Sequence, residues 1–406
     1  MTDLDPTRRP RLRRNLEAAQ LDPGIWVLTD RQRLSPESLG LSLGALRIIQ
    51  EFDGQKSLGE IQQQFRNTGL TVSLSQLHEL AEALDYALFL EGPTFEDYLR
   101  GPVRRPSCIG CYPPEPAAIR SLLDSLFEPP AGPGKPGRSA TTVSSPGPLR
   151  AALLPHMDYR RGGVTYGWGY AELLKQTRAR LFVIIATSHY SFQRFTLTRQ
   201  DFLTPLGRVA TDQEYVDRIV AEFGDEVFAD PYAHYPEHSI ELEVLMLQHL
   251  LGDHEPFRIV PLLVGSFHDC IESGIDPAEQ PDIQRMVQAL RRAEAGAGEP
   301  VCYLISGDLA HIGPKFRDPH PVSDDQLAMS ARADQILLDR LVAADPQGLF
   351  SHIAGEQDRR RICGFPPGWL ALEVARPRSG RVLHYQQFVD PERTESVSFA
   401  AVAFYE

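Results

Sequence analysis

The chain has 406 residues, 42% of them hydrophobic and 23% charged, which is typical of a globular protein and more than one core usually organises. Its formal net charge of −13 argues against non-specific binding to nucleic acid or to an anionic membrane. No run of about 18 apolar residues is present, and the basic N-terminus lacks the apolar segment of a signal peptide. We therefore expect two domains and no membrane span.

The five cysteines are sparse, and only Cys108 and Cys111 lie close together in the sequence. An odd number cannot all pair, and this spacing is typical of reduced, cytoplasmic proteins, so we expect a cytoplasmic location. A single CxxC supplies only two of the four ligands of a structural zinc site. We interpret the pair as accidental, with a redox role as the alternative.

Residues from about 22 to 91 predict a small helical module. "SLGALRIIQEFDG" has helical periodicity with Gly54 as the expected stop, and "SLGEIQQQFR" has the capping-box spacing of Ser57 and Glu60. "SLSQLHELAEALDYALFLEG" places Ser75 before a long amphipathic helix and a short apolar strand. Three helices with a terminal strand predict a winged-helix-like domain.

Winged-helix modules often bind DNA, but six basic and eleven acidic residues between Asp30 and Arg100 give this one a net charge of −5. That sign favours a peptide or protein ligand over phosphates. "FDGQKSLGEI" followed by "SLSQLHELAEALDYALFL" resembles the PqqD-like peptide-recognition domain. The resemblance implies a peptide chaperone that works beside radical-SAM enzymes, so we expect a peptide or a radical-SAM enzyme as partner.

The Pro/Gly/Ser-rich stretch at residues 129–148 reads as an interdomain linker, and an α/β pattern follows it. Continuous apolar runs predict strands buried on both faces of a mostly parallel sheet. These runs are "LRAALLPH", "RLFVIIATSH", "FRIVPLLVGSF" and "VCYLISGDLAH". "DQEYVDRIVAEF" and "SIELEVLMLQHLL" predict helices, and the last two apolar segments predict strands that close the sheet.

Polar side chains follow three of the predicted strands: His156, His189, and Asp308 with His311. Sites in open α/β sheets form outside the carboxyl ends of the strands, so these residues are expected to converge. A single histidine after a strand is more often structural, but three such strand ends predict a metal or acid–base site.

"PEHSIELE" adds His238, with Glu237 and Glu241 at a spacing that would stack the two carboxylates on a helix. Acidic residues are also favoured at a helix N-terminus for electrostatic reasons alone. That explanation covers the glutamates but leaves the histidine unexplained, so His238 remains a candidate site residue.

Cys363 lies in "RICGFPPG", where glycine permits close approach and the prolines stiffen the loop. Two imidazoles and one thiolate would suit zinc, iron or copper and leave positions open for water or substrate. A buried packing thiol is the alternative on spacing alone.

A family resemblance covers nearly all of residues 103–406. The motifs "RRPSCIGCYPPEPAAIRSLLDSLF", "LLPHMDYRRGG", "IIATSHY", "TPLGRVATDQEYVDRI", "EHSIELE", "VPLLVGSF", "SGDLAHIGPKF" and "RICGFPPG" occur in the order found in the Memo family, also called AmmeMemoRadiSam system protein B. That family resembles the class III extradiol dioxygenases, in which two histidines and a carboxylate hold a non-haem iron, with cysteine replacing the carboxylate in Memo-like proteins.

The resemblance implies that His156, His189 and Cys363 are the metal ligands. It implies that His238, Asp308 and His311 surround them as catalytic residues, with His311 at the position of the dioxygenase base. It also moves the domain boundary to 102/103, so that residues 129–148 become a loop within the second domain.

The chain departs from the family pattern in three of these motifs. Cys111 stands where the family usually has tryptophan, and Tyr190 stands where a second histidine or a similar residue is usual. "PHMDY" replaces "PHAGY" and places Asp158 near the site, either behind a metal ligand or paired with Arg160 or Arg161.

Two functions follow from these observations. One is an iron- or copper-dependent oxidoreductase in which His311 serves as acid or base and Asp308 positions it. The other is a scaffold whose first domain recruits a peptide or a radical-SAM enzyme while the second stores metal or binds a ligand. Zinc hydrolysis is less favoured, since the thiol-containing ligand set and the family resemblance do not suit it.

Overall fold

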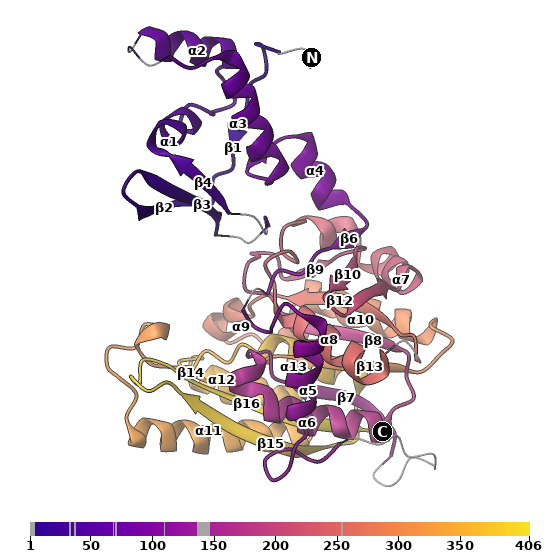
Figure 1. Ribbon diagram of the computed structural model, residues 1–406. Helices are drawn as coiled ribbons and strands as arrows, with labels where there is room; N and C mark the ends of the chain where they lie inside the picture. Colours follow the sequence, from indigo (N-terminus) through magenta and orange to yellow (C-terminus); the bar gives the residue numbers. More distant parts are fainter. Residues whose placement is uncertain are drawn as a thin grey trace. The chain divides into compact units, whose positions relative to one another are not determined.

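The computed structural model describes residues 5–31, 34–35, 38–67, 69, 71–108, 110–135, 147–252 and 255–406. The chain divides into two compact units between Pro102 and Val103 (Figure 1). Each unit has its own hydrophobic core.

The described residues of the first unit form a small antiparallel sheet and four helices. Strands β2 (Leu16–Asp22), β3 (Ile25–Asp30) and β4 (Leu39–Ser42) pair in that order, and β1 (Arg11–Leu12) pairs separately with β5 (Leu90–Glu91). The helices are α1 (Leu43–Ile49), α2 (Leu58–Asn67), α3 (Leu74–Tyr86) and α4 (Pro93–Arg100). The three predicted helices and the terminal strand are confirmed, while β2 and α4 extend the module beyond its predicted limits.

The helix ends follow local capping chemistry. The predicted capping box of α2 is confirmed, because the Ser57 N–H donates to Glu60 at 2.7 Å and the Glu60 N–H donates to the Ser57 hydroxyl at 3.2 Å. The prediction for α3 is wrong: Ser73 caps this helix. Ser73 has glutamine three residues later, a side chain that can return a bond to the cap, whereas Ser75 has His78 there.

Gly54 is not the stop of α1, because that helix ends at Ile49, five residues earlier. Two successive turns close the segment, in which the Glu51 N–H donates to Ile48 and the Phe52 N–H donates to Ile49. Phe52 is thereby buried in the core of the first unit, so burial of this side chain accompanies the end of the helix.

The second unit is built on one large sheet with the predicted parallel centre. Strands β7 (Leu149–Leu154), β13 (Val301–Ser306), β8 (Leu181–Thr187) and β12 (Arg258–Val264) are parallel neighbours in that order. At one side β16 (Ser396–Tyr405) runs antiparallel to β7, and β14 (His311–Ile312) and β15 (Ser379–Val389) pair with it. The other side continues through β11 (Gly207–Thr211), β10 (Asp201–Thr204) and β6 (Val103–Arg104), with β9 (Phe195–Leu197) on β12.

Helices cover both faces of this sheet (Figure 1). Helices α5 (Pro116–Ser125), α6 (Tyr159–Gln176) and α8 (Ser239–Leu251) contribute to the core on one face. The core on the other face takes residues from α7 (Gln213–Phe223), α9 (His268–Ser273), α10 (Pro281–Ala295), α11 (Asp324–Val342), α12 (Pro346–Gly355) and α13 (Phe365–Ala375). Alternate residues of β8 enter the two cores, which explains its continuous apolar sequence.

The interpretation of residues 129–148 as an interdomain linker is wrong. Residues 129–135 and 147–148 belong to the second unit, well after its first strand, and residues 136–146 lie outside the described part of the chain. Among the helices that the structure describes, none is both long and apolar enough to cross a lipid bilayer.

Candidate metal centre

Three parallel strands end at the same edge of the sheet and carry the polar residues that the sequence singled out. Ser306 of β13 pairs with Leu154 of β7 and with Ala186 of β8, so the three carboxyl ends are level. His156, Asp308 and His189 each follow their strand by two residues. The predicted convergence of these three side chains is therefore observed.

Cys363 reaches this edge because two glycine backbones lie against each other. The Gly364 N–H donates to the Asp308 carbonyl oxygen at 2.8 Å, and a Cβ on Gly307 would lie 2.4 Å from the Gly364 Cα. Any side chain at either position would push the two loops apart. The contact leaves Cys363 Sγ 3.3 Å from His156 Nε2 and 3.3 Å from the Asp308 N–H nitrogen.

His156, His189 and Cys363 offer one donor atom each, and these three atoms all lie within 4.8 Å of one another. Imidazole nitrogen and thiolate sulfur are ligands of zinc, iron and copper, and three protein ligands leave room for water or substrate. Burial, and then the neighbouring His189 and His238, lower the pKa of His156 well below its usual range. The neutral imidazole that results is the form that binds a metal, so these residues fit a mononuclear site.

Glu237 fixes the orientation of His189. Its carboxylate accepts from His189 Nδ1 at 3.0 Å and from the His189 backbone N–H at 2.8 Å, which leaves Nε2 as the ring nitrogen available to a metal. Burial alone would raise the pKa of Glu237, but the adjacent His189 holds it well below its usual range. Burial opposes the charged form of His189 as well, yet Glu237 and Cys363 raise the pKa of this ring well above normal.

Glu237 also explains why α8 begins where it does. Its carboxylate accepts the backbone N–H groups of His238 at 2.9 Å and Ser239 at 3.1 Å, the first free donors of the helix. The predicted stacking of Glu237 and Glu241 is wrong, because Glu237 precedes the helix and binds His189 while Glu241 pairs with Arg104.

His238 belongs to the same cluster of rings. It stacks on His189 with centroids 5.0 Å apart, lies 5.2 Å from the His156 ring, and places Nδ1 3.2 Å from Glu237. Its side chain is partly exposed, unlike that of His156, so His238 is accessible at the rim of the cluster.

Asp308 and His311 have partners that differ from those expected. Asp308 accepts the His156 backbone N–H at 3.1 Å, and no described hydrogen bond joins it to His311. Instead, His311 Nδ1 lies 3.1 Å from the Leu309 carbonyl oxygen and 3.0 Å from that of Arg361. Two backbone carbonyls, and not Asp308, therefore position His311. They can do so because the segment after Asp308 lies against the loop of residues 360–361, where the His311 N–H donates to the Arg360 carbonyl oxygen.

The contacts set the tautomer of His311, and burial sets the protonation of both groups. Nδ1 of His311 must carry the proton that is shared with the two carbonyls, so Nε2 is the free base of the ring. Burial lowers the pKa of His311 to about 4, so that this imidazole is neutral near pH 7. Burial likewise raises the pKa of Asp308 to about 7.

A cavity of about 230 Å³ opens beside the cluster and includes His189 and Cys363 in its wall. Phe267, Phe365 and Pro366 line it with apolar surface. Its size admits a small organic molecule, and its position lets such a molecule approach two of the three candidate ligands.

Asp158 is a helix cap. It accepts the backbone N–H of Arg160 at 3.1 Å and Nε of Arg161 at 2.5 Å, at the start of α6. Of the two alternatives from the sequence, the arginine partner is the observed one.

The segment before α5 is tied to α8 by contacts that no pattern in the sequence indicates. The Arg104 guanidinium and the Glu241 carboxylate form an ion pair with both side chains fully buried. Glu241 also accepts from the Ser107 N–H at 3.0 Å, the Cys108 N–H at 3.2 Å and the Tyr112 hydroxyl. The motif that contains Arg104 and Tyr112 does not reveal this contact, since their partner lies about 130 residues away.

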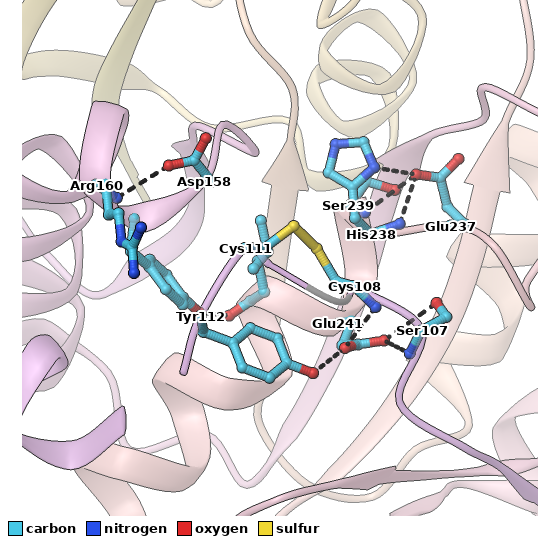
Figure 2. The surroundings of a disulfide bond; sticks show 12 residues. Ser107, Cys108, Cys111, Tyr112, Asp158, Arg160, Glu237, His238, Ser239 and Glu241 are labelled. Atoms are coloured by element: carbon cyan, nitrogen blue, oxygen red, sulfur yellow. Dashed lines mark hydrogen bonds and ion pairs between the residues drawn. A yellow bond between two sulfur atoms is a disulfide. The ribbon is translucent and has the colours of Figure 1, made fainter. Parts of the chain in front are cut away.

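Cys108 and Cys111 form a disulfide within this segment (Figure 2). The interpretation of the CxxC as accidental is therefore wrong, and this pair departs from the reduced state that the sparse cysteines indicated. The other three cysteines are free.

The fold and the cluster define an α/β protein with a candidate two-histidine, one-cysteine metal site at the carboxyl edge of its sheet. A family model described as "Memo-like protein" matches residues 104–403. The chain belongs to the Memo family.

Curated relatives carry the same family name. A MEMO1 family protein of Aquifex aeolicus is 23% identical over 374 residues, covering 89% of this chain and 91% of that protein. One of Desulfurococcus amylolyticus is 27% identical, covering 72% of this chain and 95% of its own length. MEMO1 family protein MTH_45 of Methanothermobacter thermautotrophicus is 28% identical, with 65% and 85% covered.

Proposed function

We propose that the second unit binds one iron or copper ion through His156, His189 and Cys363 and uses it for redox chemistry on a small molecule. The observation that supports this most directly is the approach of two imidazoles and one thiol to within 4.8 Å, with His189 and Cys363 in the wall of a cavity. Bound there, such a metal would supply one-electron chemistry, and a thiolate in place of a carboxylate favours the softer copper ion.

The residues around the ligands have distinct tasks in this proposal. Glu237 holds His189 with Nε2 toward the ligand cluster, and Asp308 holds the backbone of His156. His311, neutral and with a free Nε2, serves as the base that takes a proton from the substrate. The half-buried His238 is the second group able to exchange a proton at the rim.

An assay of oxygen uptake and of metal reduction with candidate small phenols and thiols tests the reaction. Cys363→Ala is expected to abolish both signals together with the metal. His311→Gln is expected to keep the metal and lose about 10²–10⁴-fold in rate, the usual contribution of a general base. Full activity in Cys363→Ala would contradict the proposal.

The alternative function is a scaffold in which the first unit recruits a peptide or a radical-SAM enzyme. Two features favour it. The first is the PqqD-like sequence pattern, and the second is the match to the Aquifex protein, because the matched region covers 89% of this chain and so includes part of the first unit. A pull-down with the full chain and with residues 103–406 separates the two roles. Loss of the partner in the shorter chain with unchanged metal content supports the scaffold.

A further inference from the structure

The disulfide between Cys108 and Cys111 lies beside the candidate metal centre. Figure 2 draws Glu237, His238 and Ser239, at the start of α8, among its surroundings, together with Asp158 and Arg160 at the start of α6. None of the roles proposed for the metal ligands or for His311 uses this pair of sulfurs.

The disulfide adds little to the stability of the segment that carries it. The two cysteines are three residues apart, so the bond closes a very short loop, and the entropy removed from the unfolded chain grows with loop length. The Cys111 N–H already donates to the Cys108 carbonyl oxygen at 3.2 Å, closing the same turn. Glu241 holds the flanking Ser107, Cys108 and Tyr112 without using either sulfur.

The two sulfurs differ in accessibility. Cys108 is 3% exposed, whereas Cys111 is half-buried at the border of the core. An attacking thiolate therefore reaches Cys111 Sγ first.

We propose that Cys108 and Cys111 form a reversible dithiol–disulfide couple that exchanges with an external dithiol through Cys111. A thiolate of that dithiol attacks Cys111 Sγ, the bond to Cys108 Sγ breaks, and Cys108 leaves as a thiolate and takes up a proton. In the resulting mixed disulfide, one sulfur of the external dithiol is bonded to Cys111 Sγ. The second thiolate of the same dithiol attacks that external sulfur, and Cys111 leaves as a thiolate that is protonated in turn. Two electrons and two protons pass to this chain, and the external dithiol becomes a disulfide.

The couple lies close to the first turn of α8. Glu241 joins the disulfide segment to this helix, whose N-cap is His238, so the pair is a neighbour of the element that carries a ring of the candidate site. The couple itself needs no metal, and its test is independent of the proposed function.

The test is a redox titration of the full-length native protein. The chain is equilibrated in mixtures of reduced and oxidised dithiothreitol, quenched in acid, alkylated, and the peptides with Cys108 and Cys111 are quantified by mass spectrometry. The disulfide fraction is expected to fall from above nine tenths to below one tenth across the series, with unchanged circular dichroism. A bond that opens only in denaturant, or thiols that stay free in oxidised dithiothreitol, would overturn the proposal.

Single variants test the assignment of the attacked sulfur. With Cys108→Ser, the remaining Cys111 is expected to form a mixed disulfide with oxidised glutathione at least ten times faster than Cys108 does in Cys111→Ser. Peptide mapping distinguishes both from the free Cys270, Cys302 and Cys363. Equal rates, or a faster Cys108, would overturn the order of attack.

The source of the external dithiol is resolved by comparing reductants at equal thiol concentration. Reduction at least ten times faster by a thioredoxin than by dithiothreitol identifies a protein dithiol as the donor. Equal rates identify a small dithiol, and failure of both reductants on the folded chain overturns the couple.

Discussion

At the scale of single residues, the centre depends on which form of each imidazole the fold permits. His156 is kept neutral by burial, as a metal ligand must be, while Glu237 turns the ring of His189 and gives it a carboxylate partner. The pKa values of these neighbouring histidines are therefore shifted in opposite directions, because Glu237 and Cys363 outweigh burial at His189 while burial prevails at His156.

His234, away from the candidate ligands, is expected to make the stability of the second unit depend on pH. Its ring is 2% exposed and its Nε2 lies 3.1 Å from the Thr196 carbonyl oxygen, and burial lowers the pKa of His234 to about 3. Below about pH 6.5 the unfolded ring binds a proton that the folded ring cannot accept. Stability is therefore lost as the pH falls from about 6.5 toward 3, by about 3 kcal/mol at pH 4.

Urea unfolding of the wild type and of His234→Gln at pH 7, 5.5 and 4 measures this effect. The variant is expected to be less stable at pH 7 but to lose less stability on acidification. Equal losses in the two proteins between pH 7 and pH 4 would show that His234 does not titrate as described.

At the scale of elements, the loop before α13 places the candidate ligand Cys363 through a close contact of two glycine backbones and a bond from the Thr187 hydroxyl to the Cys363 carbonyl oxygen. A Cβ on Gly364 would lie 2.7 Å from the Asp308 carbonyl oxygen. Gly364→Ala is therefore expected to cost about 1–3 kcal/mol and to weaken metal binding without removing a ligand, because Cys363 moves with the loop.

Gly368→Ala is the matched control, since this glycine lies in α13 and a Cβ added to it would meet no atom within 4 Å. It is expected to keep both stability and metal content, because alanine favours a helix more than glycine does. Both properties are measured by chemical denaturation and elemental analysis. If the two variants behave alike, the glycine contact does not position Cys363.

The start of α3 offers a second test at this scale. Ser73→Ala removes the hydroxyl that accepts the Gln76 N–H at 3.2 Å and is expected to destabilise the first unit by about 1 kcal/mol. Ser75→Ala lies inside the helix and is expected to change stability by less than about 0.5 kcal/mol. Thermal unfolding of the first unit, measured in the full chain, distinguishes the two variants. A larger loss of stability in Ser75→Ala than in Ser73→Ala would contradict the assignment of Ser73 as the cap.

Much of the architecture could be predicted because its signals are local. Continuous apolar runs indicated the central strands, and the residue two positions beyond each strand end indicated the edge at which the site forms. The Ser57–Glu60 box was equally local, whereas the choice between Ser73 and Ser75 depended on which one had a glutamine three residues later.

The contacts that could not be predicted join distant segments. Nothing near Asp308 shows that it holds the His156 backbone, or that carbonyls of Leu309 and Arg361 take its place at His311. The Arg104–Glu241 pair and the Cys108–Cys111 disulfide depend likewise on how the 103–112 segment lies on α8. Sequence patterns indicate that residues share an edge, but not which donor meets which acceptor.

At the scale of the whole molecule, all the candidate ligands lie in the second unit, and they come from three separate segments of it. The parallel strands bring His156 and His189 to one edge, and a loop more than 170 residues beyond His189 completes the set with Cys363. We therefore expect metal binding to depend on the assembled sheet and to require neither the first unit nor its partners.

The central claim is tested most directly by anaerobic metal analysis of the purified chain after reconstitution with iron or copper. Four proteins are compared: the wild type, Cys363→Ala, His156→Ala, and His320→Ala as a control at an exposed histidine. We expect close to one equivalent of iron or copper in wild type and in the control, and less than about a tenth of that in both ligand variants. No bound metal in reconstituted wild type, or equal metal in all four proteins, would contradict the assignment of these ligands.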